Sequence, residues 1–387
     1  MRIGILTRRA GYNHGSSLQA YAMAQFISSL GFSCKIIDYD EYAPHFRWKI
    51  RPAIENIMWA ILRRMPSITK RICNSRYQHL YTRNRQQEKF KIFEQQFMPL
   101  TKERCSSSGT LCKISTQFDA IVCGSDQIWN PAFFDPAFFL EFVPANGRIL
   151  KIAYAPSIGI TDKTLIPKKE IDLLKKFDAI SCREKEGTLL LKHITDKPVS
   201  MVLDPTLMVS ADNWKSLCSP IATDEKGYIL VYFLHSSCYE DNIPHNFIKK
   251  LREKTGLPIY NIKMHNLINN IEADKHFEET DPCEFLYLLQ HATWICTNSF
   301  HCSIFSFLFQ KKFFVFERFM KGGNEGNSQN SRIRSLLEVF NMPQCLKKES
   351  DSPKLNQEFD FEMGIKKLQA YQQESKNYLI SALSSHK

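Results

Sequence analysis

Short apolar segments alternate with polar turns and helical patterns from the first residues onward. Residues 2–7 form a short apolar run, and apolar positions between 18 and 30 then recur at helical spacing until Gly31. A second apolar run covers residues 33–39. This order predicts a βαβ unit. The loop at residues 11–17 then lies at the carboxyl end of the first strand, where ligands usually bind in open parallel sheets.

The same alternation returns in two later series of apolar strands, each followed by a polar turn. The first series comprises residues 118–131, 151–159, 177–187 and 199–208. The second comprises residues 227–234, 257–262, 292–309 and 312–316. This alternation predicts an α/β protein. Because a chain of 387 residues exceeds the ~250 to 300 residues of one ordinary core, we expect two domains. These would be doubly wound, Rossmann-like and facing each other across a cleft.

The composition changes at two places that suggest domain limits. Residues 205–225 are polar, which predicts an N-terminal Rossmann-like domain over residues 1–215 and a C-terminal one over residues 216–350. Residues 351–387 form an amphipathic C-terminal helix in this prediction. Residues 45–100 are basic, poor in strand patterns and apolar along one helical face, and are therefore predicted to be a helical insertion in the N-terminal half.

The positive charge is concentrated in that insertion. Residues 45–100 hold twelve Lys and Arg against three Glu, a net charge of +9 out of +11 for the whole chain. The rest is nearly neutral, which argues against nucleic acid as a partner. One hypothesis is that the insertion docks on an anionic membrane, where each basic residue contributes ~1 kcal/mol. The alternative is a solvated helical hairpin.

Neither export nor metal binding is indicated. The N-terminal apolar run is shorter than a signal-peptide core, and no ~18 consecutive residues are apolar. The twelve cysteines are scattered singly, several in apolar runs, without a CxxC pair. We therefore expect a cytoplasmic protein with reduced cysteines and no metal site.

The first candidate motif follows the apolar run that ends at Cys123. Gly124 permits a sharp turn, and Ser125, Asp126, Gln127 and Trp129 then present groups suited to a sugar or an organic acid. Asp126 is a candidate catalytic carboxylate. The alternative is that Asp126 caps the next turn while Trp129 packs in the core.

A second motif places a histidine at the start of a predicted helix. Asn298 and Ser299 follow the strand at residues 292–296, and His301 heads the helix, where free backbone N–H groups favour an anion. A histidine there can exchange protons near neutral pH. The alternative is a structural histidine.

Two further segments supply candidate anion-binding groups. Arg183 follows the strand at residues 177–180 and could grip a phosphate or carboxylate through two parallel hydrogen bonds, or else pair with Glu184 or Glu186 on the surface. The loop and helix start containing Gly15, Ser16 and Gln19 form the weakest candidate, since one glycine does not make a phosphate loop.

Taken in order, these segments resemble the polysaccharide pyruvyl transferase family across nearly the whole chain. The matching pieces are NHGSSLQAYAM, GSDQIWNP, YAPSIG, SCREKEG, LDPTLM, TNSFHCSIFSFLF with KKFFVF, and RIRSLLEVF. The resemblance implies a two-Rossmann, GT-B-like fold. It also implies transfer of the pyruvyl group of phosphoenolpyruvate to sugar hydroxyls as a ketal, with no metal or cofactor.

The resemblance also implies roles for individual residues. Arg183 would hold the phosphate or carboxylate of the donor, and His301 would act as acid or base. Many family members carry an arginine where this chain has Ser299. Arg332 or Arg334 would then have to supply the second positive charge, or the donor would be a different molecule.

Three functional hypotheses follow. The leading one is a pyruvyl transferase that acts on a surface polysaccharide or its lipid-linked precursor, at the inner face of the cytoplasmic membrane if the insertion docks there. A second is a nucleotide-sugar-dependent glycosyltransferase of the same architecture. A third is a non-catalytic module that binds an anionic surface through residues 45–100.

Overall fold

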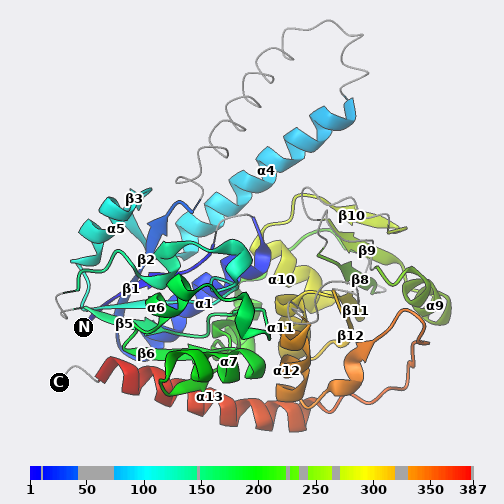
Figure 1. The fold of residues 1–387 in the computed structure, drawn as a ribbon. Helices are drawn as coiled ribbons and strands as arrows, with labels where there is room; N and C mark the ends of the chain where they lie inside the picture. Colours follow the sequence, from blue (N-terminus) through cyan, green and yellow to red (C-terminus); the bar gives the residue numbers. More distant parts are fainter. Residues whose placement is uncertain are drawn as a thin grey trace, which may run out of the picture.

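The structure is a computed structural model of the chain of 387 residues. It describes residues 1–9, 12–41, 74–145, 149–223, 227–234, 243–263, 271–318 and 330–384. Two parallel sheets, each flanked by helices, form two halves (Figure 1). The predicted α/β class with two Rossmann-like units is therefore confirmed.

The first sheet has seven strands in the order β3-β2-β1-β4-β5-β6-β7, all parallel. This order extends the doubly wound pattern, in which the strand order reverses beside β1 and leaves a crevice at the carboxyl ends. The strands are β1 (Arg2–Leu6), β2 (Ser33–Tyr39), β3 (Leu100–Cys105), β4 (Ala120–Cys123), β5 (Leu150–Ala153), β6 (Ala179–Cys182) and β7 (Val199–Met201).

Helices cover both faces of this sheet. They are α1 (His14–Ser29), α4 (Asn74–Phe97), α5 (Ser108–Ser115), α6 (Lys168–Leu174), α7 (Lys185–Thr195) and α8 (Ala211–Ser216). Helix α1 begins where the Asn13 side chain accepts hydrogen bonds from the backbone N–H groups of Gly15 and Ser16. It ends just before Gly31, whose φ of 86° suits a residue without Cβ. The helix also packs against α10 and α11 of the other half, so it lies between the two sheets.

The second sheet has six parallel strands in the order β10-β9-β8-β11-β12-β13. The strands are β8 (Ile229–Tyr232), β9 (Ile259–Ile262), β10 (Lys275–Phe277), β11 (Trp294–Thr297), β12 (Lys312–Phe316) and β13 (Leu346–Lys347). The helices are α9 (His245–Thr255), α10 (Pro282–His291), α11 (Phe300–Leu308) and α12 (Ser331–Val339). Along the sequence, the polar junction at residues 205–225 lies between β7, the last strand of the first sheet, and β8, the first strand of the second.

Helix α13 (Phe361–Ser384) runs beneath both halves (Figure 1). Near its start, Lys367 donates a hydrogen bond to the backbone carbonyl of Glu338 in the second half. Nearer its end, the Tyr378 hydroxyl donates to the carbonyl of Ala153 in the first half. The helix therefore ties the two halves together, as the amphipathic pattern of the last residues allows.

The predicted insertion at residues 45–100 is described only in part, because residues 45–73 lie outside the described residues. Most of its remainder is helical, since α4 covers Asn74–Phe97 and rises away from both sheets (Figure 1). The predicted segment extends too far, because Leu100 is the first residue of β3. Strand β3 and helix α5 were not predicted. β3 is an edge strand whose sequence LTKERC is mostly polar, so it lacks the apolar signal of the central strands.

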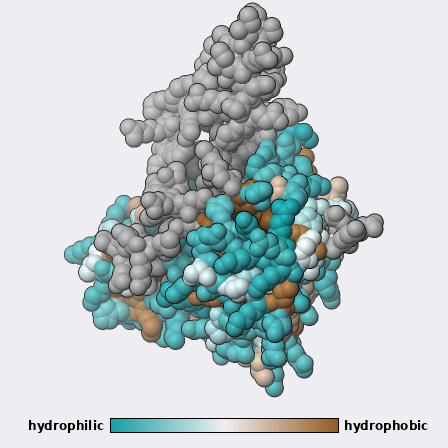
Figure 2. All heavy atoms as spheres, turned by 90° about the vertical axis from the view of Figure 1, so that its right-hand side faces the viewer, coloured by the Kyte–Doolittle hydropathy of each residue, from teal (hydrophilic) through white to brown (hydrophobic). Residues whose placement is uncertain are grey.

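The described surface offers no membrane-spanning element. On the face shown in Figure 2 it is mostly hydrophilic, with only small hydrophobic areas. Within the described ranges, none of the helices combines the length and the apolar character needed to cross a bilayer.

Candidate active site

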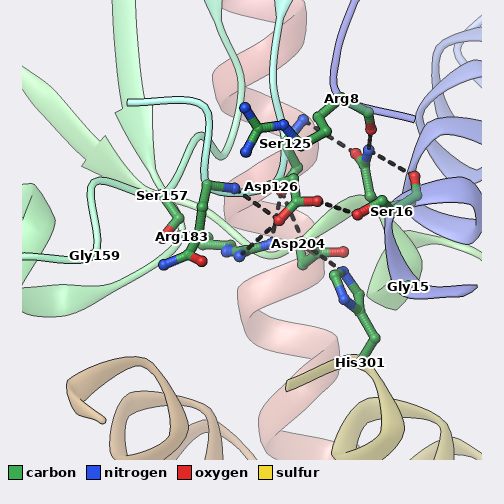
Figure 3. Close-up of polar contacts among 12 residues, drawn as sticks. Arg8, Gly15, Ser16, Ser125, Asp126, Ser157, Gly159, Arg183, Asp204 and His301 are labelled. Atoms are coloured by element: carbon green, nitrogen blue, oxygen red, sulfur yellow. Dashed lines mark hydrogen bonds and ion pairs between the residues drawn. The ribbon is translucent and has the colours of Figure 1, made fainter. Parts of the chain in front are cut away.

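A cavity of about 250 Å³ lies where the carboxyl edge of the first sheet meets the second half. Its lining from the first half comprises Arg8, Asn13, Ser16, Asp126, Gln127, Phe133 and Arg183. Its lining from the second half comprises Leu234, Asn298, Ser299, Phe300, His301, Arg318, Asn330, Arg332 and Ile333. The loops that sequence analysis singled out therefore meet at one place (Figure 3).

Arg183 is the most enclosed charge of this cavity. It directly follows β6, and its side chain is 1% exposed. Its Nη1 donates to Asp204 Oδ2 at 2.7 Å, and its guanidinium carbon lies 4.4 Å from the centre of the Phe300 ring. The closest approach to Glu184 is 3.9 Å, between buried groups. The alternative of a surface ion pair is therefore wrong.

Asp204 is the central carboxylate of the cluster, and it was not among the residues predicted to form the site. It follows β7, and its Oδ2 accepts hydrogen bonds from Arg183 and from the Ser125 hydroxyl at 2.8 Å. Burial disfavours the charged form, but His301 and Arg183 outweigh burial and hold the pKa of Asp204 well below its usual range. The available signal was an aspartate after an apolar strand, within the piece LDPTLM.

His301 reaches the same carboxylate from the second half. It is the second residue of α11, whose start is capped by the Ser299 hydroxyl, which accepts from the N–H of Cys302. The ring Nε2 lies 3.6 Å from Asp204 Oδ2. The Nδ1 side of the ring lies against Gly15, where an added Cβ would come within 2.2 Å of Nδ1. Gly15 is thus required for this approach of α1 to the histidine.

Asp126 lies at a turn that only particular residues can form. A Cβ on Gly124 would lie 2.2 Å from the backbone oxygen of Tyr154, and Gly124 has a φ of 120°. The turn presents Asp126 Oδ2 to the hydroxyl of Ser16, which donates a short hydrogen bond to it. Burial raises the pKa of Asp126, but Arg183 and then His301 lower it by more, so the carboxyl stays ionised.

Further arginines make the cavity positive. Arg332 from α12 is buried in the lining, and burial followed by the neighbouring Arg183 lowers its pKa to about 9. Arg334 instead points to the surface, where it pairs with Glu317. Arg332 and Arg334 were both considered as the second arginine that binds the donor. Of these two, only Arg332 lines the cavity. Arg318, which sequence analysis missed, lines the cavity directly after β12; an arginine following the apolar run KFFVF was the signal.

Some buried donors at the cavity lack a hydrogen-bond acceptor among the described residues. These donors are Arg183 Nε, Arg183 Nη2 and His301 Nε2. Buried donors normally have a partner, and leaving one unpaired costs about 1–3 kcal/mol. Each of these atoms instead faces a carboxylate beyond hydrogen-bond distance. Arg183 Nη2 lies 3.7 Å from Asp126 Oδ1, Arg183 Nε lies 3.9 Å from Glu184 Oε2, and His301 Nε2 lies 3.6 Å from Asp204 Oδ2.

Four predicted site residues do not line the cavity: Gly15, which packs against His301, and Trp129, Ser125 and Gln19. Trp129 is 1% exposed and packs against Phe139 and Phe177, with its Nε1 donating to the carbonyl of Phe138. This placement corrects the expected substrate contact: the large indole ring fills the core of the first half. It agrees with the alternative that Trp129 is a core residue.

Ser125 and Gln19 are fully buried behind the cavity wall. The Ser125 hydroxyl contacts Asp204, while the Gln19 amide donates to the backbone carbonyls of Arg8 and Ser16. Ser125 and Gln19 therefore do not face the cavity but hold in place the residues that line it.

Asn298 does line the cavity. Its side chain also forms hydrogen bonds with both the backbone N–H and the backbone carbonyl of Leu234.

Metal ligands do not gather at this site. In the part of the chain that the structure describes, no group of three or more His, Cys, Asp or Glu side chains is placed to hold a metal ion. The ten described cysteines are free thiols.

Comparison with known proteins gives a family and several distant structural relatives. The structure of a UDP-GlcNAc 2-epimerase from Neisseria meningitidis bound to UDP-GlcNAc is similar, with a TM-score of 0.47, 12% identity and 99% of each chain covered. Anabaena Alr3699/HepE in complex with UDP and glucose has a TM-score of 0.47 and 8% identity, covering 98% of this chain and 100% of that one.

The family assignment comes from sequence. A search of curated proteins gives no match. The family model for polysaccharide pyruvyl transferase matches residues 13–318, which include most of the residues that line the cavity. This chain is therefore a transferase that belongs to the polysaccharide pyruvyl transferase family.

Proposed function

We propose that this transferase moves the pyruvyl group of phosphoenolpyruvate onto two hydroxyls of a sugar, as a ketal. The acceptor in this proposal is a surface polysaccharide or its lipid-linked precursor. The supporting observation is that Arg183 and His301, from different halves, line one small cavity together with Arg8, Arg318 and Arg332.

The donor fits the size and charge of this cavity. At about 250 Å³ it is smaller than the ~300–1,000 Å³ typical of sites for drug-sized ligands, so it suits a compact molecule. Phosphoenolpyruvate carries a phosphate and a carboxylate on three carbons. The Arg183 side chain would bind one of these groups, and Arg332 would bind the other.

The reaction needs one proton donor and a stabilised cation. A proton from the His301 imidazole adds to the donor's methylene carbon, and a sugar hydroxyl attacks the cation-like carbon that results. The C–O bond to phosphate then breaks, and a second hydroxyl forms the ketal. Of the two hydroxyl protons released, one restores His301 and the other leaves with phosphate. Asp126 remains a carboxylate because of its lowered pKa, so its role is to stabilise the cation.

The direct test is phosphate release measured by ³¹P NMR, with an isolated lipid-linked oligosaccharide as acceptor. We expect release only when phosphoenolpyruvate and acceptor are both present. Arg332→Gln should weaken donor binding, whereas Arg334→Gln, on the same helix but outside the cavity, should not. Stabilisation by a uridine nucleotide but not by phosphoenolpyruvate would instead favour the glycosyltransferase alternative.

The proposal extends to the membrane because of the basic insertion at residues 45–100. Its net charge of +9 suits an anionic lipid surface, which is where a lipid-linked acceptor would be met. In this extension of the proposal, the enzyme works at the inner face of the cytoplasmic membrane. Sedimentation with vesicles containing phosphatidylglycerol should carry the protein down at low salt, and phosphatidylcholine vesicles should not. No sedimentation with either would refute this extension.

A further inference from the structure

Asp204 joins the two residues on which the proposed reaction depends. Its Oδ2 lies 2.7 Å from Arg183 Nη1 and 3.6 Å from His301 Nε2, and all three side chains are buried. Arg183 comes from the first half and His301 from the second. The carboxylate of Asp204 is therefore a shared counter-charge at the junction of the halves (Figure 3).

The two oxygens of Asp204 have different partners. Oδ1 accepts from the backbone N–H and the hydroxyl of Thr206, and so caps the short helical turn that follows. Oδ2 accepts from Ser125 and Arg183 and faces His301. Capping of this helical turn uses only Oδ1. Oδ2 takes no part in the cap.

Charged groups approach His301 from several elements. Asp204 and Asp126 contribute negative charge from the segments after β7 and β4, and burial of both lets them act at short range. The positive groups on the same cavity are Arg8, Arg183, Arg318 and Arg332. Asp204 is the carboxylate that the structure pairs directly with the imidazole, at Nε2, the nitrogen with no hydrogen-bond acceptor among the described residues.

We propose that Asp204 is a positioning residue, whose Oδ2 holds the His301 ring at the cavity across the junction of the two halves. Oδ2 faces Nε2 on one side of the ring, and the Gly15 contact fixes the opposite side. This role rests on the proposed function. It requires both halves, since neither contains the pair alone.

The test compares Asp204→Asn with Thr206→Val in the full chain. The first change removes the charge at Oδ2, and the second removes only a partner of Oδ1. We expect Asp204→Asn to lower kcat about 100-fold. Thr206→Val should leave kcat unchanged, even if it lowers the melting temperature. An unchanged kcat in Asp204→Asn would overturn the proposal.

A double-mutant cycle separates this role from support of Arg183. In a His301→Gln background, Asp204→Asn should have little further effect on kcat, because its action requires the imidazole. Full additivity would contradict the proposal. Should Asp204→Asn not fold, Arg183→Gln is compared with Arg183→Gln plus Asp204→Asn, which removes the Asp204 charge together with its arginine partner. The combined variant should still have a lower kcat than Arg183→Gln alone.

The failure of the proposed function would look different. It would appear in the wild-type protein, as an absence of phosphate release from phosphoenolpyruvate and acceptor. Failure of the Asp204 inference would appear only in the variants, against an active wild type.

Discussion

The two walls of the cavity are built in different ways. On the first-half wall, Arg183, Asp204 and Asp126 are linked to one another and to Ser16 and Ser125 by hydrogen bonds and ion pairs. On the second-half wall, His301 extends from the first turn of α11 and keeps Nε2 without a hydrogen-bond acceptor among the described residues. The first wall holds fixed charges, and the second contributes His301, the proton donor in the proposed reaction.

This difference shows how the site divides its work. The loops that follow β4, β6 and β7 all begin at the same edge of the sheet. The charged side chains on these loops can therefore be held in place before any ligand binds. The proton-transfer group is brought to them by the packing of a separate half. Changes on the first wall should therefore affect stability and binding together, while changes on the second should affect catalysis with little loss of stability.

The largest expected effect is on catalysis. His301→Gln should lower kcat about 10²–10⁴-fold, the usual contribution of a general acid, while the melting temperature stays close to wild type. Steady-state phosphate release and calorimetry check the two parts. A variant that retains full activity would remove His301 from the proposed chemistry.

Replacing Arg183 by leucine should mainly cost stability. It leaves Asp204 and Asp126 buried without their counter-charge, so the free energy of unfolding should fall by about 3–5 kcal/mol in urea denaturation. Arg334→Leu, at an exposed arginine, should change it by less than about 1 kcal/mol. Equal losses for the two variants would show that the first wall is not the rigid one.

Acid should weaken the contact between the halves through His14. This residue of α1 is fully buried, its Nε2 lies 2.9 Å from the carbonyl oxygen of Thr280, and its ring stacks on Phe285. Burial lowers the pKa of His14 from 6.5 to about 4.

Because the unfolded chain then binds the proton more readily, stability is fully present above pH ~6.5 and falls between pH ~6.5 and ~4, by up to about 3 kcal/mol. His14→Phe should flatten this dependence in denaturation measured across that range. A slope identical to that of the wild type would contradict the assignment.

Gly15→Ala should disturb the second wall without touching its charges. The added Cβ would overlap His301 Nδ1, so the ring must move, and kcat should fall about 10–100-fold. Gly109→Ala, at a helical glycine with open space around it, is the matched control and should leave kcat unchanged.

The smallest effect is expected at Trp129, outside both walls. Trp129→Phe removes one buried hydrogen bond and some packing, which should cost about 1–2 kcal/mol of stability and leave KM for both substrates unchanged. A raised KM would restore the substrate contact that the sequence suggested.

The sequence was informative where chemistry follows a strongly apolar strand. Arg183 and Ser299–His301 were found because each follows such a strand, and parallel strands bring those positions to one edge. Asp204 was missed because it follows a strand of only three residues, and an Asp-Pro pair is also a common turn signal.

Other features of the site could not be predicted from the sequence, because they depend on how segments far apart in the chain pack together. The positions of Arg318 and Arg332 relative to Arg183, and the choice of Arg332 over Arg334, require the packing of the two halves. The same holds for Trp129, because an amphipathic ring after a turn suits a core as well as a binding site. Strand β3 was missed because this edge strand has a mostly polar sequence, which lacks the apolar run that marks a central strand.

The most direct test of the account is a crystal structure of the full chain with phosphoenolpyruvate bound. It should show one anionic group of the donor on the Arg183 side chain and the methylene carbon facing the His301 ring. Donor bound away from this cavity, or held by one half with the histidine turned from it, would contradict the claim that both halves act on one donor.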